Sequence, residues 1–94
     1  MERTQTPMPT LVQVVTGHFR QGKGYTNWRE QGTNDWLLIL TREGRGRFGY
    51  QGGEYIAQKG DITLLKPHTL HDYGVEPSLQ YWELVWAHFH PRPH

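Results

Sequence analysis

The sequence predicts an all-β fold, and three of its features support this prediction. Eleven glycines and six prolines are spread along the 94 residues, where they separate short apolar runs. These runs recur about every ten residues, which is the spacing of strands in a β-sandwich or barrel. No stretch of helical length places apolar residues at positions i, i+3, i+4 and i+7.

The length and composition describe one small domain that depends on a few large side chains. A chain of 94 residues has no room for a second domain and is marginally stable alone, so association or a bound ligand would help it. Only 35% of its residues are hydrophobic, yet 13% are aromatic and four of these are tryptophan. The core is therefore expected to rely on aromatic anchors rather than on many aliphatic residues.

Charge and cysteine content exclude several classes of function. Ten Lys and Arg residues balance nine Asp and Glu residues, and the densest basic group (Arg42, Arg45 and Arg47) lies beside Glu43. This is not the electrostatic footprint of a nucleic-acid-binding surface. The absence of cysteine, of an apolar leader and of a membrane-length apolar run predicts a cytoplasmic location without a membrane partner.

The first part of the chain is expected to form an arm and one strand. Residues 1–10 are polar and interrupted by prolines, which predicts a flexible N-terminal arm. Residues 11–16 are rich in β-branched side chains and are expected to form a strand that Gly17 follows. Residues 20–24 contain two glycines and are expected to form a loop.

The middle of the chain contains the most apolar strand. A short strand is expected at residues 25–29, followed by a turn at 31–35. Residues 36–41 are almost entirely apolar, so we expect a central strand that is buried on both faces. The glycine-rich residues 43–46 then turn the chain into a strand at 47–50.

Turn signals define the next two strands. Paired glycines at 51–54 predict a tight hairpin into a strand at residues 55–58. Gly60-Asp61 forms a corner that leads into an apolar, buried strand at residues 62–66. Pro67 ends this strand because proline has no N–H to donate to a sheet.

The last two strands carry the residues that suggest a binding cavity. His71 and Tyr73, two residues apart in a strand at 71–75, are expected to share a face. In the long strand at 79–89, side chains alternate between two faces. One face carries a mixture of aromatic and polar side chains, which suits the wall of a cavity. That set comprises Trp82, Leu84, Trp86 and His88.

An ordered set of these residues resembles the N-terminal ligand-binding domain of AraC-type transcription regulators. The resemblance covers residues 11–92, and its parts are specific as a set rather than singly. They are Arg29, the run from Asp35 to Gly46, Gly60-Asp61-Ile62, Leu64, Pro67, His71, Tyr73, Trp82, and the run from Trp86 to Pro91.

The resemblance implies a cupin-like antiparallel β-barrel of jelly-roll type that binds a small effector, often a sugar. It places this effector-binding domain at residues 11–90, with a short tail at 91–94. In the family, helices that dimerise and a DNA-binding domain follow the barrel, and these parts are missing from the 94 residues. We therefore expect a sensor with no cofactor and a homodimer as its assembly, with DNA bound only through a further domain.

The resemblance also implies that Arg29, Tyr73 and Trp86 contact the effector. Their chemistry agrees, because a sugar presents a C–H face that stacks on an indole and hydroxyls that need directional partners. Trp82 and His88 complete the expected ligand-binding set. Plainer interpretations are a surface charge for Arg29, a barrel-lining hydroxyl for Tyr73, core aromatic rings for the tryptophans and a satisfied interior histidine for His88.

Leu84 departs from the pattern of the arabinose-binding members of the family, which have a histidine at this position. One polar contact is therefore lost, and the sequence argues against arabinose itself as the ligand.

The alternative function is a small metal-dependent cupin enzyme, such as an isomerase or dioxygenase. Its metal ligand would be His71, since enzymatic cupins combine such a histidine with two others and a carboxylate. Residues 36–43 supply no histidine, so we expect no native metal site. No activated serine or cysteine, paired carboxylates or phosphate-binding loop is evident, and no enzymatic activity is expected.

Overall fold

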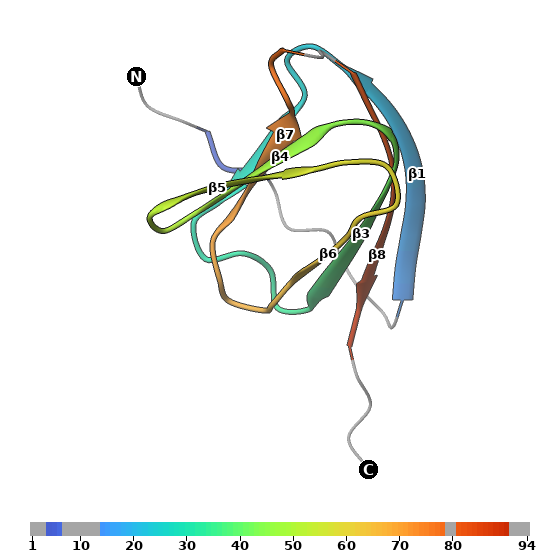
Figure 1. Cartoon of the computed structure of the whole chain (residues 1–94). Coiled ribbons are helices and arrows are strands. Elements are labelled where there is room, and N and C mark those ends of the chain that lie inside the picture. The colour runs from blue at the N-terminus through green and yellow to red at the C-terminus, as the bar shows by residue number, and fades with distance from the viewer. Residues whose placement is uncertain (1–3, 7–13, 79–80, 91–94) are drawn as a thin grey trace.

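The computed structural model describes residues 4–6, 14–78 and 81–90, and these residues form strands without a helix (Figure 1). The all-β prediction is confirmed. The eight strands are β1 (Val14–Gly22), β2 (Thr26–Arg29), β3 (Trp36–Gly44), β4 (Gly46–Tyr50), β5 (Gly53–Ala57), β6 (Ile62–Leu65), β7 (His71–Val75) and β8 (Tyr81–Phe89).

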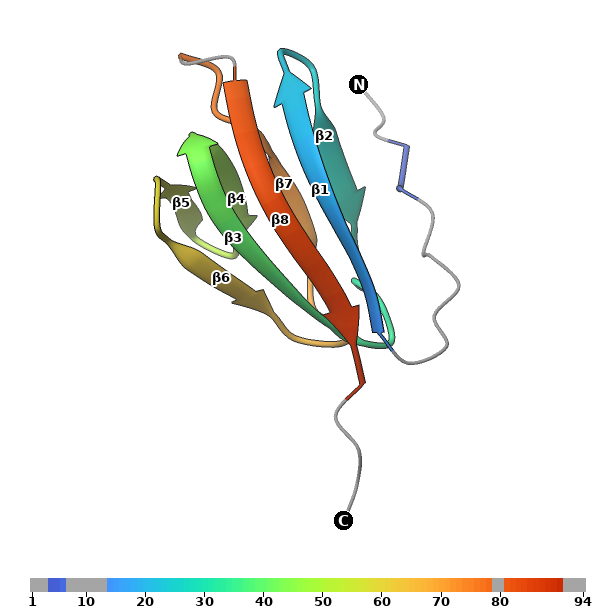
Figure 2. The same cartoon turned by 90° about the vertical axis from the view of Figure 1, so that its right-hand side faces the viewer.

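Two antiparallel sheets of four strands face each other (Figure 2). One sheet has the order β1-β8-β3-β6 and the other has the order β2-β7-β4-β5. Consecutive strands lie in different sheets at every connection except the β4–β5 hairpin. Each sheet is therefore built from strands that are distant in sequence, and neither sheet can form without the rest of the chain.

β1 is longer than predicted, because Gly17 does not end it. β1 pairs with β8 in unbroken register from Val14 to Gly22, so the expected loop begins only at Lys23. Gly17 lies opposite Trp86, and a Cβ on Gly17 would come within 2.3 Å of the indole Cζ2. Glycine is needed inside this strand because the indole occupies the space of its side chain. Residues 11–13 lie outside the described part of the chain.

β3 is central, as predicted, but the expectation that it is buried on both faces is wrong. Its burial alternates: Leu37 and Ile39 are buried between the sheets, whereas Leu38 and Leu40 on the other face are half-buried. The apolar run thus covers one fully enclosed face and one outer face, and only the inner face is part of the core.

β6 was predicted to be buried, and it is instead an exposed edge strand. Pro67 follows its end at Leu65 as expected, but Ile62 is 64% exposed and Leu64 is 50% exposed. β6 pairs only with β3, so its outer edge and outer face have no neighbouring strand among the described residues. An apolar run of four residues does not by itself distinguish a buried strand from an edge strand.

The predicted hairpin between β4 and β5 is confirmed. Tyr50 pairs with Gly53, so the loop consists of Gln51 and Gly52 alone. Gly52 has a φ of 98°, a conformation that glycine adopts without steric cost. The hairpin projects away from the rest of the molecule (Figure 1).

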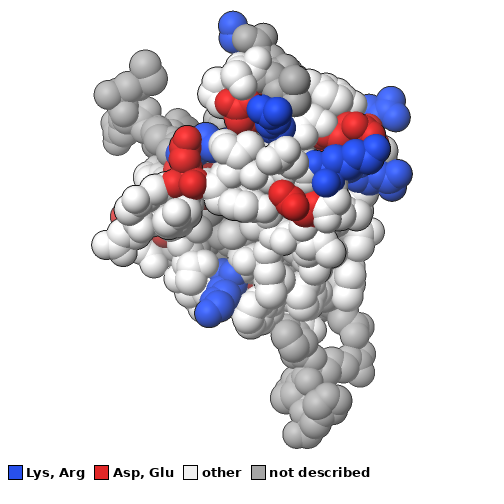
Figure 3. Space-filling model, in the orientation of Figure 1, with Lys and Arg blue, Asp and Glu red and all other residues white. Residues whose placement is uncertain are grey.

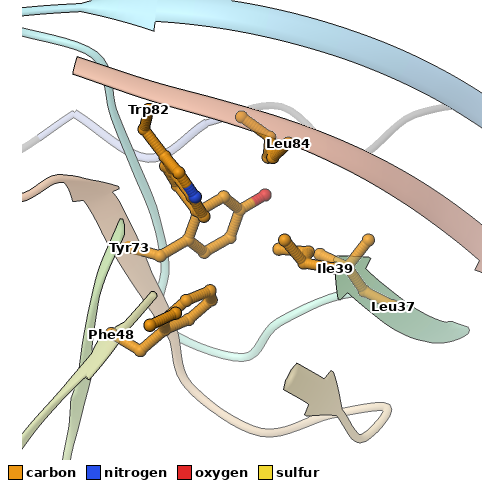
Figure 4. Close-up of a cluster of buried hydrophobic side chains, with 7 residues drawn as sticks. Leu37, Ile39, Phe48, Tyr73, Trp82 and Leu84 are labelled. Atoms are coloured by element: carbon orange, nitrogen blue, oxygen red, sulfur yellow. The ribbon is translucent and has the colours of Figure 1, made fainter. Parts of the chain in front are cut away.

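The core is an aromatic cluster between the two sheets. The rings of Phe48 and Tyr73 stack at 5.6 Å, and the Trp82 ring meets both of them edge to face (Figure 4). Trp82 is fully buried, and its indole N–H donates to Thr41 Oγ1 at 3.1 Å. Because its polar atom is satisfied, Trp82 combines a large buried area with no desolvation penalty.

Part of the N-terminal arm contacts the edge of β2. The backbone N–H of Thr6 donates to the carbonyl of Trp28 at 2.9 Å, and Gln5 Oε1 accepts from the N–H of Glu30 at 3.1 Å. Residues 1–3, 7–13, 79–80 and 91–94 lie outside the described part. The predicted boundaries of the arm, the domain and the tail therefore stay predictions.

Charges on the surface are mixed in sign. Figure 3 shows Lys and Arg next to Asp and Glu, with no continuous basic area on the face in view. Arg47, for example, donates to Glu54 at 2.7 Å and to Asp72 at 3.2 Å. No helix that is long and apolar enough to cross a membrane occurs among the residues described.

Gly46→Ala is expected to destabilise the fold by about 1–3 kcal/mol, which is typical of overpacking a core. A Cβ on Gly46 in one sheet would lie 2.3 Å from the buried Trp82 ring in the other. Urea unfolding followed by tryptophan fluorescence measures the change. Gly22→Ala is the matched control, because nothing lies within 4 Å of its Cβ position. Equal stability of the two variants would contradict this account of the core.

Candidate functional site

A cavity of about 180 Å³ lies between the two sheets. Side chains from β1, β2, β3, β7 and β8 surround it, together with Tyr25 just before β2. Its lining comprises Phe19, Tyr25, Asn27, Arg29, Leu37, Ile39, Tyr73, Leu84, Trp86 and His88. Apolar and aromatic side chains therefore make most of the wall, and a few polar groups converge on it, as in ordinary small-molecule sites.

Arg29 and Tyr73 form the polar side of the cavity. The pairing of β2 with β7 places Arg29 opposite His71, two residues from Tyr73. Arg29 Nη1 donates to Tyr73 Oη at 3.4 Å, and Arg29 as a whole residue is 7% exposed. Burial raises the pKa of Tyr73, although the Arg29 charge opposes this shift. The phenol is therefore neutral and presents a hydroxyl to the cavity.

His71 lies behind Arg29 rather than in the cavity wall. Arg29 Nη1 donates to His71 Nδ1 at 3.5 Å, so the proton of the neutral ring is on Nε2. Burial, followed by the nearby charges of Arg29 and His88, lowers the pKa of His71 to about 4. Nε2 has no hydrogen-bond partner among the described residues. The neutral imidazole helps to position the guanidinium without repelling it.

Trp86 forms an aromatic wall together with Phe19 and Tyr25. The rings of Phe19 and Trp86 lie 5.5 Å apart, and those of Phe19 and Tyr25 lie 6.3 Å apart. The indole rests on the backbone of Gly17, which fixes its distance from β1. Burial, followed by the neighbouring Tyr73, raises the pKa of Tyr25 to about 12, so this hydroxyl is also neutral.

A buried hydrogen-bond chain supports His88. His88 Nδ1 and Asp35 Oδ1 are 3.1 Å apart, and Thr33 Oγ1 donates to the same carboxylate oxygen. Burial alone would raise the pKa of Asp35, but the hydrogen bonds from Thr33 and His88 outweigh it and hold the pKa below its usual range. An ionised carboxylate is therefore in contact with a histidine of the cavity wall.

Four of the five predicted ligand contacts meet around the cavity, and the fifth does not. Arg29, Tyr73, Trp86 and His88 all line it, whereas Trp82 belongs to the core cluster. Trp82 shares the inner face of β8 with the others, as alternation predicted, but it lies where the sheets are filled. Leu84 lines the cavity and contributes no polar atom there.

Sequence reasoning missed Asn27 and Tyr25 in the wall. Asn27 is buried, and its Nδ2 has no hydrogen-bond partner in the described part of the chain. Tyr25, Asn27 and Arg29 are spaced two residues apart, so their side chains share one face. The same rule that grouped His71 with Tyr73 would therefore have found them. Asp35 was also missed, because its contact with His88 joins positions 53 apart in the sequence.

The described residues contain no group of three or more His, Asp or Glu side chains placed to hold a metal ion. His71, the metal ligand considered from the sequence, has its Nδ1 against the Arg29 guanidinium. A positive group at this position disfavours a cation, so the residues around His71 do not fit a metal centre.

Comparison with known proteins identifies the family. Residues 14–92 match the model of the AraC-like ligand binding domain. The chain belongs to this family. The arabinose operon regulatory protein of Escherichia coli K12 is 35% identical over 75 residues, which are 77% of this chain and 26% of that protein. The AraC-like domain described here thus spans only a minor part of the curated relatives that it matches.

Solved structures confirm the cupin fold of this AraC-like domain. A cupin superfamily protein of Desulfitobacterium hafniense aligns over 97% of this chain and 84% of its own, with a TM-score of 0.72 and 11% identity. The iron(II) form of HppE aligns over 82% of this chain and 43% of its own, with a TM-score of 0.68 and 13% identity. Identities this low establish the shared fold and nothing more.

His71 is expected to make the AraC-like domain less stable as the pH falls from about 6.5 to about 4. Its pKa is lowered in the folded state, so the unfolded chain binds the proton first. Above about pH 6.5 the ring is neutral in both states, and the folded domain has its full stability. Between there and about pH 4 the free energy of unfolding falls by roughly 3 kcal/mol. Carboxylates with lowered pKa values, such as Asp35, also contribute to the free energy of unfolding. They lose this contribution only at a pH below the window in which His71 titrates.

Urea unfolding at several pH values measures this dependence. His71→Gln should flatten the curve in this window, whereas His68→Asn, a change at an exposed turn residue, should leave its slope unchanged. A wild-type slope that survives in His71→Gln would show that another group is responsible.

Proposed function

We propose that this domain is the effector-sensing part of a transcription regulator and binds a monosaccharide or a similarly small polar metabolite. The observation that carries the proposal is the convergence of Trp86, Arg29 and Tyr73 on one cavity between the sheets. Membership of the AraC-like ligand-binding family supports it, and so does the relative that regulates the arabinose operon.

The wall of the cavity suits the two kinds of surface that a sugar presents. Trp86 offers an aromatic platform for the C–H face of a ring. Arg29 donates, the hydroxyl of Tyr73 both donates and accepts, and Asn27 has an unused donor in its Nδ2. These groups lie on β2 and β7, opposite the β8 strand that carries Trp86, so a flat ring between the sheets meets both.

The size of the cavity favours a single small ring. Its volume is about 180 Å³. Pockets for drug-sized ligands are larger, at about 300–1,000 Å³. Leu84 is apolar and stands where the resemblance places a histidine in arabinose-binding members of the family, which favours a ligand other than arabinose.

Signalling would follow from a difference in ligand affinity between two states of the protein. A ligand shifts an equilibrium only as far as it binds one state better than the other. In this proposal the two states differ in the N-terminal arm or in partner domains of a cytoplasmic homodimer, and DNA is bound by a domain outside these residues. The domain itself performs no catalysis.

A thermal-shift screen against pentoses, hexoses and uronic acids tests the proposal. A ligand present at a hundred times its dissociation constant should stabilise the domain by about 2.7 kcal/mol, a shift of roughly 10 °C or more for a domain of this size. If no compound of these classes shifts the melting temperature, the sugar-sensor proposal is wrong. Stoichiometric iron, manganese or nickel in the purified protein would point to the cupin enzyme instead.

Trp86→Leu is expected to weaken binding of a sugar found in the screen by at least about tenfold, because the platform for its C–H face is lost. Isothermal titration calorimetry measures the change in Kd. Trp36→Leu is the matched control, since Trp36 is half-buried on β3 and does not line the cavity. Unchanged affinity in Trp86→Leu would place the ligand elsewhere.

A further inference from the structure

We propose that Asp35 is a positioning residue that holds His88 as a hydrogen-bond acceptor in the cavity, so that the effector must donate a hydroxyl hydrogen to His88 Nε2. This inference rests on the proposed function, because it specifies the ligand chemistry of the same cavity. It concerns two residues that the motif of Arg29, Tyr73 and Trp86 does not include.

The supporting chain of contacts is buried along its whole length. Thr33 is fully buried, Asp35 is 3% exposed and His88 is 4% exposed. Thr33 Oγ1 donates to the Asp35 carboxylate, which lies 3.1 Å from His88 Nδ1. Asp35 directly precedes β3, which pairs with the β8 strand of His88. The pairing of β3 with β8 thus brings Asp35 close to His88, and the hydrogen bond from Thr33 holds its carboxylate in place.

The carboxylate determines which nitrogen of the imidazole carries the proton. An ionised carboxylate only accepts hydrogen bonds, so His88 Nδ1 must be the N–H that donates to Asp35. In a singly protonated ring, Nε2 then has a free lone pair and accepts. The contact with Asp35 occupies Nδ1, and His88 lines the cavity. Nε2 is therefore the ring nitrogen left for a ligand.

An acceptor at this position changes what the cavity selects. The lining residues include no carboxylate, and their polar groups include the donors of Arg29 and Asn27. Those donors suit the oxygen atoms of many ligands. A fixed acceptor at Nε2 requires in addition that the ligand donate a hydrogen bond. A hydroxyl group can donate one, whereas an ether or carbonyl oxygen cannot. A buried acceptor without a donor is penalised, so the position discriminates against ligands that lack the hydroxyl.

Nitrogen NMR of the protein labelled with ¹⁵N-histidine tests the tautomer directly. His88→Gln identifies the His88 signals by their loss. We expect a protonated, pyrrole-like Nδ1 and an unprotonated, pyridine-like Nε2 in the wild type. In Asp35→Asn the amide can donate to Nδ1, so the proton should move to Nε2 in part or wholly. Glu54→Gln, at an exposed carboxylate on β5, is the matched control and should leave the spectrum unchanged.

A wild-type spectrum with Nε2 protonated would overturn the proposal without the need for any variant. An Asp35→Asn spectrum identical to that of the wild type would overturn the positioning role. If Asp35→Asn does not fold, the wild-type spectrum still decides which nitrogen accepts.

Ligand titrations test the consequence for recognition. The probes are L-arabinose, D-xylose, D-galactose and D-glucuronate, together with singly deoxygenated and O-methylated forms of whichever binds most tightly. One O-methylated position should weaken wild-type binding about tenfold and Asp35→Asn binding much less, which is the coupling expected of groups in contact. A purely structural role of Asp35 would weaken all of the probes by the same factor.

The two proposals fail in different ways. If neither these four sugars nor any other compound of the thermal-shift screen binds, the proposed function and the hydroxyl requirement are both wrong, and the NMR spectrum alone then decides the tautomer. If a sugar binds and Asp35→Asn weakens every derivative equally, the acceptor role is wrong and the sensor function stands.

Discussion

The packing of aromatic rings between the two sheets is the constraint on which the rest of the structure depends. Trp82 is fully buried against Phe48 and Tyr73, and Gly46 in the opposite sheet leaves the space for its indole. Since nearly every connection crosses from one sheet to the other, this contact joins segments that are far apart in sequence. It fixes the distance between the sheets, and that distance sets the width of the cavity beside it.

Tyr73 belongs to the core and to the cavity at once. Its ring stacks on Phe48 (Figure 4), and its hydroxyl accepts a hydrogen bond from Arg29. The neutral imidazole of His71 accepts a hydrogen bond from the same guanidinium. The polar side of the candidate site is thus anchored in the aromatic core, and its groups are preorganised before a ligand arrives. Preorganisation reduces the entropy that a ligand must offset on binding.

Much of the fold followed from local patterns, whereas Arg29, Tyr73 and Trp86 were assigned to the candidate site through the resemblance to the family. Alternation in β8 correctly placed Trp86 and His88 on one face, and the two-residue period of β7 correctly placed His71 and Tyr73 on one face. Three expectations were wrong for reasons that local patterns do not contain. β6 is an edge strand, β3 has one outer face, and β1 continues through Gly17. Each depends on which strand lies alongside, and strand order is not written in any single segment.

The sequence by itself determined the all-β class, most of the turns and the face on which side chains of one strand lie, because these depend on neighbouring residues and on the two-residue period of a strand. Only the tertiary structure decided that Trp82 fills the core while Trp86 lines the cavity, although both lie on one face of β8. It also decided the contact between Asp35 and His88. These outcomes depend on how two sheets pack, and packing brings together residues that no local spacing relates.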